Sequence, residues 1–382
     1  MRERLNSAAD ALLPVLATLA ALAVGAVMLL ILGADPIQAY GAMWEGAFGS
    51  TNAIAETLVK ATPLLLVGLG ICIAFRGNVI NIGGEGQMVV GAILATLVGL
   101  NLSSLPGWFV IALALLAGFL GGAIWGAIPG FLKAYFNVNE ILSTIMMNAI
   151  AVQGMNFLLR GPMIDPAQQQ LESKIPQTAR LDEAFQLPRL VPTRLHLGAG
   201  IAVVLAVLVF ILLWRTTLGY RIRAVGQNPH ASRYAGINVK QHIVIALLLS
   251  GAFAGLAGAT QVFGLNYRMI TDGSATGFTG NAGFNGIVAA LFGQLHPIGT
   301  IPASIFFGAM LVGANKMQRV VQVPSALITT LNGLVVIFVV SSEIWRRQRQ
   351  QRRLREMGAA SEGGPPDVPD EESKVAESEV VA

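Results

Sequence analysis

Hydrophobic runs recur along this chain, most of them as long as a helix that crosses a bilayer. A helix spans the hydrocarbon core with about 20 apolar residues. The candidate runs are 11–32, 53–75, 86–103, 108–132, 140–159, 198–214, 242–264, 280–293, 298–315 and 325–342. Only 12% of the 382 residues are charged, about half of what soluble domains carry. The sequence therefore predicts an all-α, polytopic integral membrane helical bundle of about ten transmembrane helices.

The run 280–293 is too short to cross the membrane alone, and a glycine-rich segment, 272–283, leads into it. Broken or re-entrant helices occur in membranes only inside protein or beside water, so the number of spans is eight to ten. The motif Asn81-Ile-Gly-Gly-Glu-Gly86 is echoed by Asn281-Ala-Gly-Phe-Asn-Gly286. We expect these two segments on opposite membrane faces, as in an inverted repeat.

Basic residues predict the orientation, because cytoplasmic loops are enriched in Lys and Arg. A cytoplasmic N-terminus places most of them inside: Arg2, Arg4, Arg76, Lys133, Arg215, Arg221, Arg223, Arg233, Lys240 and the arginines of 346–355. Segment 160–197 is then extracytoplasmic, with nearly balanced charges. Residues 1–345 form the membrane domain, and 346–382 form a cytoplasmic tail, basic and then acidic, with the composition of a disordered segment. Both termini are expected in the cytoplasm, with the chain multi-pass in the plasma membrane and in contact with lipid.

A short helix is predicted within the loop Gly219–Gln241. Asn228 has the N-cap side chain, Pro229 stands at the first helical position, and Gly236 suits a left-handed end about two turns later. The arginines of this loop are Arg221, Arg223 and Arg233. A capped and basic helix exceeds what a simple connection needs. We expect a docking element on the cytoplasmic face.

Catalytic motifs are absent from the sequence. There is no GxxxxGK[ST] phosphate loop and no GxSxG elbow. The histidines, His196, His230, His242 and His296, lack the spacing of metal ligands. Cys72 lies in a hydrophobic run and is expected to be a buried structural thiol. The chain is therefore expected to be neither an enzyme nor a nucleic-acid binder, and to hold no cofactor of its own.

Uncharged polar residues within or near the spans predict a solute pathway, since each is costly in hydrocarbon unless it is paired or faces water. The polar candidates are Asn148, Gln153, Asn156, Asn266, Tyr267, Asn281 and Asn285, and the aromatic Phe284 is a candidate beside them. Amides and aromatic rings suit a neutral, partly flat solute, and we expect the first three to share one interior surface. The alternative is that they form amide bonds between helices.

Carboxylates deep in the spans are scarce, which argues against coupling to an ion gradient. Glu85 and Glu140 stand near helix starts, where they would bond helix N-termini, and Glu56 is one turn from Lys60, a local ion pair. Glycines repeat at close spacing at 118, 122 and 126 and at 251, 255 and 258. Such spacing predicts close helix packing and no chemistry.

Four ordered blocks resemble the permease subunits of bacterial ATP-binding-cassette (ABC) importers in the branched-chain amino-acid, ribose and nucleoside branch. They are Arg76–Ile93, Asn137–Val152, Gly219–Ile237 and Gly283–Gly299. The first is similar to that family's FN-x-G-x-EGQ signature, with Ile80 in place of Phe. The second, beginning NVNE, is similar to the nucleoside and simple-sugar members. Asn285 stands where the family often has an acidic residue.

The resemblance implies alternating access driven by ATP and Mg bound to partner ATP-binding subunits. It also implies a second permease, related or a second copy, and an extracytoplasmic solute-binding protein. The residues expected to couple the chain to the ATPase are Arg221, Arg223, Ala224, Gly226, Asn228, Pro229, Ala231, Arg233, Gly236 and Ile237.

Two other functions stay open from the residues alone. An ion-coupled secondary transporter would move solute as a purified chain in liposomes under an ion gradient. A non-transporting membrane scaffold would leave the uptake of every candidate solute intact when it is deleted.

Overall fold

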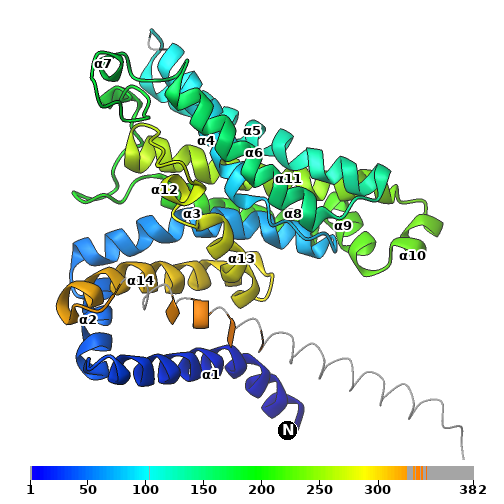
Figure 1. Cartoon of the computed structure of the whole chain (residues 1–382). Coiled ribbons are helices and arrows are strands. Elements are labelled where there is room, and N and C mark those ends of the chain that lie inside the picture. The colour runs from blue at the N-terminus through cyan, green and yellow to red at the C-terminus, as the bar shows by residue number, and fades with distance from the viewer. Residues whose placement is uncertain are drawn as a thin grey trace, which may run out of the picture.

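The computed structural model describes residues 2–102, 104–324, 330–331, 333–335, 337–338 and 341, with the backbone alone for 2–15. Within these residues every regular element is a helix, and the β-structure is limited to isolated bridges (Figure 1). The elements are α1 (Arg2–Ile31), α2 (Pro36–Phe48), α3 (Thr51–Arg76), α4 (Gly84–Asn101), α5 (Gly107–Phe136), α6 (Glu140–Arg160), α7 (Pro166–Gln169), η1 (Glu183–Phe185), α8 (Gly198–Arg215), α9 (Thr217–Gln227), α10 (Pro229–Tyr234), α11 (Val239–Gln261), η2 (Val262–Asn266), α12 (Ala275–Thr279), α13 (Ala282–Phe292) and α14 (Pro297–Val321). The all-α prediction is confirmed.

Among the described residues, 6 helices are long and apolar enough to cross a membrane: α3, α5, α6, α8, α14, and α11 continued by η2. The segment Leu16–Ile31 and α13 are shorter apolar helices. A helix occupies each predicted run from 11–32 to 298–315. The run 325–342 falls mostly outside the described residues, as does the tail 346–382. The chain is therefore a polytopic helical membrane protein.

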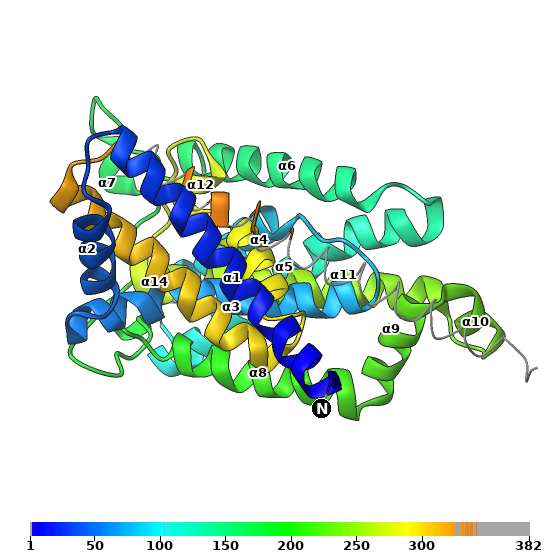
Figure 2. The ribbon, with the colours of Figure 1, turned by 90° about the horizontal axis from the view of Figure 1, so that it is seen from below.

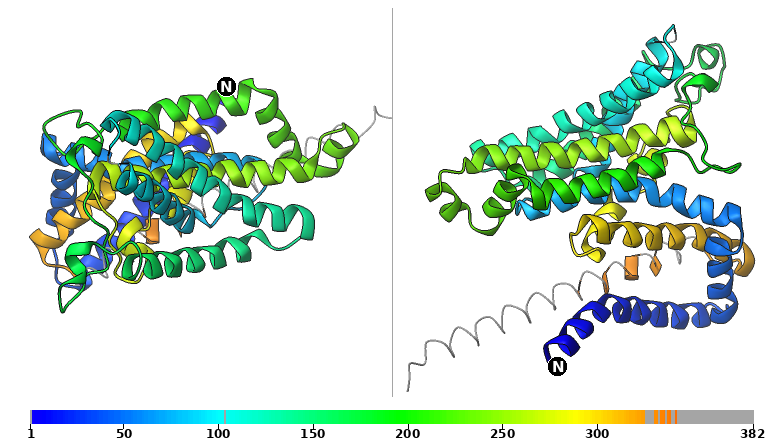
Figure 3. Two further views of the ribbon diagram at one scale, coloured as in Figure 1. Left: turned by 90° about the horizontal axis from the view of Figure 1, so that it is seen from above. Right: turned by 180° about the vertical axis from the view of Figure 1, so that it is seen from behind.

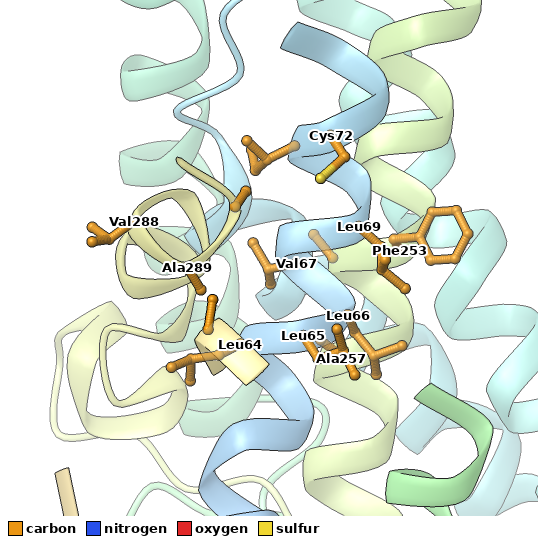
Figure 4. Packing of buried hydrophobic residues seen from close by; sticks show 14 of the residues in the cluster. Leu64, Leu65, Leu66, Val67, Leu69, Cys72, Phe253, Ala257, Val288 and Ala289 are labelled. Carbon is orange, nitrogen blue, oxygen red and sulfur yellow. The ribbon is translucent and has the colours of Figure 1, made fainter. Parts of the chain in front are cut away.

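The core of the bundle is built around α3, whose apolar window is 83% buried. In Figures 1 and 3, α1 and α14 lie on one side of α3, and α4, α5 and α11 lie on the other. Figure 4 shows Leu64 and Leu69 of α3 among side chains of α11 and α13, including Phe253 and Val288. Cys72 belongs to this cluster and is 0% exposed, as predicted.

Glycines bring the backbones of α4, α5 and α11 into direct contact. A Cβ at Gly126 would lie 2.5 Å from the Leu247 carbonyl oxygen, and one at Gly122 would overlap Gly251. Likewise, a Cβ at Gly258 would overlap the Met88 carbonyl of α4. The predicted packing role of these glycines is confirmed, and it follows from the absence of a hydrophobic driving force between helices in lipid.

The segment 160–197 folds back over the helix ends. The Leu187 amide donates to the Phe263 carbonyl at 2.8 Å, and Arg194 of the same segment pairs with Glu56 at 3.1 Å. The predicted Glu56–Lys60 pair is therefore wrong, because a longer-range guanidinium takes the carboxylate. Glu140 pairs with Lys133 at 2.9 Å, across the turn between α5 and α6.

Candidate functional site

The helix containing 280–293 is broken, as its short length predicts. Gly280 and Asn281 both adopt left-handed backbone angles, with φ of +61° each. Glycine reaches this region without steric cost and asparagine does so more readily than most residues. The break ends α12 and starts α13 next to α4, so that α13 has its N-terminus beside buried residues of another helix.

The N-termini of α4 and α13 meet at this break. A Cβ at Gly84 would lie 3.2 Å from the Gly283 Cα, so the two backbones touch. The Phe284 amide donates to Glu85 Oε1 at 3.2 Å, and the Thr279 hydroxyl donates to Glu85 Oε2. Glu85 therefore bonds a helix N-terminus, as predicted, and that helix is α13.

The two related hexapeptides therefore lie together inside the bundle, and the chain enters them from different ends: Asn81 follows the end of α3 that meets α9, and Asn281 follows Thr271, which bonds segment 160–197. The two hexapeptides meet because both segments turn into the bundle before α4 and α13 start. Asn81 is 1% exposed, in a turn folded into the bundle, and α13 starts only after the break at Gly280. Helix N-termini carry positive partial charge, and the Glu85 carboxyl lies where two of them converge.

A buried amide network fixes the turn before α4, and it is a part of the site that the sequence reasoning missed. The Asn81 amide donates to Gln87 Oε1 at 2.9 Å and to Ser250 Oγ at 2.8 Å. Its oxygen accepts from the Gly83 amide at 2.8 Å. The amide residues flanking Glu85 in the Arg76–Ile93 block were the available signal.

The polar residues of α6 do not share one surface, contrary to the prediction. Asn148 accepts from the Gly86 amide at 2.8 Å, and Asn156 accepts from the Thr271 hydroxyl at 2.7 Å. Gln153 is exposed. The step of five residues from Asn148 turns the side chain by about 140° around the helix, which carries Gln153 onto the outer face. Asn148 and Asn156 instead join α6 to the rest of the chain.

The remaining candidates fall into two groups. Asn266 is exposed and Tyr267 lies beneath the Arg180 guanidinium, 5.5 Å from ring centroid to Cζ, at the end of η2. Asn281, Phe284 and Asn285 lie together at the start of α13, beside Glu85. Phe284 is 45% exposed although its amide is bonded to Glu85. The second group therefore combines an accessible ring with amides at the helix break.

The predicted short helix in the loop 219–241 is present as α10. Asn228 Oδ1 accepts from the Ala231 amide at 3.0 Å, and Gly236 follows with φ of +78°. Tyr234 is 94% exposed, and Figure 2 shows α10 projecting from the end of the bundle. The capping prediction is confirmed in its details, and α10 presents an open surface.

A second helix, α9, connects α10 to the core and was not predicted. Thr216 caps it by accepting from the Gly219 amide at 3.1 Å, and Ile222 and Val225 are buried. A Cβ at Gly226 would overlap the Arg76 carbonyl at the end of α3. The Thr216 cap and the spacing of the apolar residues were signals that the sequence offered.

The loop residues differ in exposure along this pair of helices. The exposed ones are Arg221, Asn228, Pro229, Ala231, Arg233 and Gly236, and the partly buried ones are Arg223, Ala224, Gly226 and Ile237. Trp214 is near two cations: the Cζ atoms of Arg76 and Arg223 lie 5.2 and 5.7 Å from the centroid of its ring. The predicted coupling residues therefore include exposed positions on both α9 and α10, and a partly buried set of which Arg223, Ala224 and Gly226 lie on α9.

Among the described residues, no group of three or more His, Cys, Asp or Glu is placed to hold a metal ion. A polytopic bundle with helix breaks meeting in its interior is the architecture of a membrane transport protein. The chain belongs to the family described as the branched-chain amino acid transport system, permease component, which matches residues 53–340.

Three relatives are similar over most of this chain. The guanosine ABC transporter permease protein NupP of Bacillus subtilis is 38% identical over 331 residues, 87% of this chain and 93% of NupP. The glucose ABC transporter permease protein TsgB13 of Haloferax volcanii is 35% identical over 366 residues, 92% of this chain and 93% of TsgB13. The guanosine ABC transporter permease protein NupQ of Bacillus subtilis is 31% identical over 261 residues, 67% of this chain and 79% of NupQ. No solved structure matches.

Membership of this family makes the chain a transport component, a permease subunit, rather than an enzyme. ATP is hydrolysed on a separate subunit. The family also implies a paired permease, and Bacillus subtilis has two guanosine permease proteins, NupP and NupQ.

Proposed function

We propose that this chain forms part of the translocation pathway of an ABC importer for a nucleoside, with simple sugars as the alternative solutes. The observation that best supports this function is the helix break at which α4 and α13 meet, with Asn281, Phe284 and Asn285 beside it. An accessible ring stacks on a flat base, and amides bond neutral polar groups without requiring a charge. The names of NupP and NupQ support guanosine-like solutes, and that of TsgB13 supports glucose.

Alternating access starts, in this proposal, at α10. Closure of the ATP-binding subunits pushes α10, which moves α9 against the end of α3 at Gly226 and Arg76. The same α3 touches α13 farther along, where a Cβ at Gly68 would lie 3.3 Å from the Gly286 carbonyl oxygen. One buried helix therefore links the docking element to the helix that carries Phe284.

The partners follow from this arrangement. ATP and Mg bind to the ATP-binding subunits that contact α10, a second permease completes the pathway, and an extracytoplasmic solute-binding protein delivers the solute. The side carrying α10 is the cytoplasm. The N-terminus lies at the same end of the bundle in Figure 2, which supports a cytoplasmic N-terminus. Segment 160–197 is extracytoplasmic.

The solute is tested by uptake in proteoliposomes that contain the complete transporter, with guanosine and glucose supplied in parallel. Phe284→Ala is expected to raise the KM for guanosine by roughly 5- to 150-fold, since a stacked base contributes about 1–3 kcal/mol. Uptake of glucose alone, or guanosine uptake unchanged by the substitution, refutes a nucleoside pathway at this break.

The coupling role is tested by Gly236→Ala, because an L-residue at φ of +78° carries a strain of about 1–2 kcal/mol. Gly33→Ala is the matched control, since Gly33 has φ of +74° and both glycines have open space around them. We expect Gly236→Ala to lower the solute moved per ATP hydrolysed while Gly33→Ala does not. Equal behaviour of the two variants rules out α10 as the coupling element.

A further inference from the structure

Two membrane-spanning helices have the least buried apolar windows of the six spans, and they differ in composition. Only 22% of the apolar window of α6 and 28% of that of α8 is buried. Yet α6 has the lowest mean hydropathy of the six spans and α8 has the highest. Figures 2 and 3 show the two helices along opposite edges of the bundle. Lipid suits the exposed face of α8 but does not suit that of α6.

The exposed face of α6 combines large apolar side chains, which water does not suit, with a primary amide, which lipid does not suit. Met146, Ile150 and Phe157 are 59%, 55% and 72% exposed, which is too apolar for a water-filled path. Gln153 lies on the same face, and no hydrogen bond of its side chain occurs among the described residues. A primary amide in hydrocarbon is costly unless it is paired. The face therefore requires a protein partner that brings a polar group.

A glycine beside Gln153 points to a helix as that partner. Gly154 has no atom within 4 Å of its Cβ position, whereas the glycines of the α5–α11 contact have neighbours within that distance. Glycine costs about 1 kcal/mol in a helix interior, and nothing within the described part of the chain uses the space. Glycines that are exposed on a membrane helix allow a second helix to approach closely.

We propose that the exposed face of α6, centred on Gln153 and Gly154, is the contact surface for the paired permease subunit. A helix of that subunit packs at Gly154, and one of its polar groups hydrogen-bonds the Gln153 amide. Met146, Ile150 and Phe157 pack around this contact. This assignment rests on the proposed function only in requiring a paired permease, and it moves Gln153 from the solute pathway to the subunit boundary.

Photo-cross-linking in the complete transporter tests the location of the contact. Benzoylphenylalanine replaces Phe157 on α6, and Val204, 60% exposed on α8, in the matched control. We expect illumination to link α6 to a permease subunit and α8 to lipid. A permease adduct at Val204 and none at Phe157, or lipid adducts alone at both, overturns the proposal. The result does not depend on which solute is carried.

Assembly measurements test the two central residues. Gln153→Leu is expected to weaken subunit association by about 3- to 30-fold, the range for one hydrogen bond between membrane helices. Gly154→Leu is expected to do the same by blocking the approach. The separate chain should unfold at an unchanged temperature in both variants, because Gln153 is exposed and the Cβ position of Gly154 has no atom within 4 Å among the described residues. Normal co-purification of both variants with the partner, or labelling of Gln153→Cys in the assembled transporter by a membrane-impermeant thiol reagent, overturns the proposal.

Discussion

The carboxyl group of Glu85 provides a quantitative test of the junction between α4 and α13. Glu85 is 2% exposed and accepts from the Phe284 amide and the Thr279 hydroxyl. Among the described residues it has no ion-pair partner. Its role in this structure is therefore that of a hydrogen-bond acceptor, and an uncharged acceptor of the same shape should replace it.

Two substitutions separate the contribution of the Glu85 hydrogen bonds from that of its negative charge. In Glu85→Gln the amide oxygen still accepts from Phe284, and the amide nitrogen donates to Thr279 Oγ1, whose own proton turns to the Ala275 carbonyl at 3.0 Å. The free energy of unfolding is expected to fall by less than about 1 kcal/mol. Glu85→Ala removes both bonds, leaves a buried amide unpaired at about 1–3 kcal/mol, and opens a small cavity. For Glu85→Ala the free energy of unfolding is therefore expected to fall by about 3–4 kcal/mol in total.

The assay is thermal unfolding of the detergent-solubilised chain, combined with ATP-driven uptake by the complete transporter. Glu85→Gln should unfold close to the wild-type temperature and transport normally, whereas Glu85→Ala should unfold several degrees lower. If Glu85→Gln folds normally but abolishes uptake while ATP hydrolysis continues, the carboxyl carries a proton. The hydrogen-bond reasoning, and the assignment of all energy input to ATP, would then be refuted.

Three further predictions address the docking helix, a buried histidine and the glycine contact. Asn228→Ala removes the cap of α10 and should cost about 1 kcal/mol, seen as less solute moved per ATP with the ATPase rate kept. Burial lowers the pKa of His196 from 6.5 to about 4, so the unfolded chain binds a proton that the folded chain excludes between these values. Stability should therefore be full above pH 6.5 and fall as the pH drops toward 4, by a total on the order of 3 kcal/mol; His196→Asn should flatten this pH dependence of the unfolding temperature. A Cβ at Gly255 would overlap the Gly118 carbonyl, so Gly255→Leu should lower the free energy of unfolding by at least the roughly 1–3 kcal/mol of ordinary overpacking and prevent folding. The control variant Gly41→Leu, whose side chain enters open space, should express normally.

Local features of this chain could be predicted from its sequence because each depends on residues that are close together in the chain. Asn228, Pro229 and Gly236 form a cap, a first helical position and a left-handed end within ten residues, and the structure has all three. The same holds for the hydrophobic runs and for the break near Asn281. The caps and the break rest on backbone preferences that act over a few residues, and the runs rest on the hydropathy of about 20 consecutive side chains.

Contacts between distant segments could not be read in the same way. Glu56 is close to Lys60 in sequence but pairs with Arg194, which the fold of segment 160–197 brings to it. The Asn81 and Asn281 segments were recognised as similar, yet their contact requires both chains to turn into the bundle before α4 and α13 start. Gln153 was grouped with Asn148 and Asn156 by helical spacing, since Gln153 and Asn156 are only about 60° apart on a helix, but the fold leaves Gln153 exposed while Asn156 bonds Thr271.

The glycine contact of α4, α5 and α11 restricts which parts of the molecule can move. Side-chain contacts adjust when rotamers change, but here carbonyl oxygens and Cα atoms meet directly at Gly122, Gly251 and Gly255. Sliding or separating these helices would expose backbone without any side chain to fill the space. The three helices therefore move together as one body, and each transport cycle must place its displacements outside their mutual contacts.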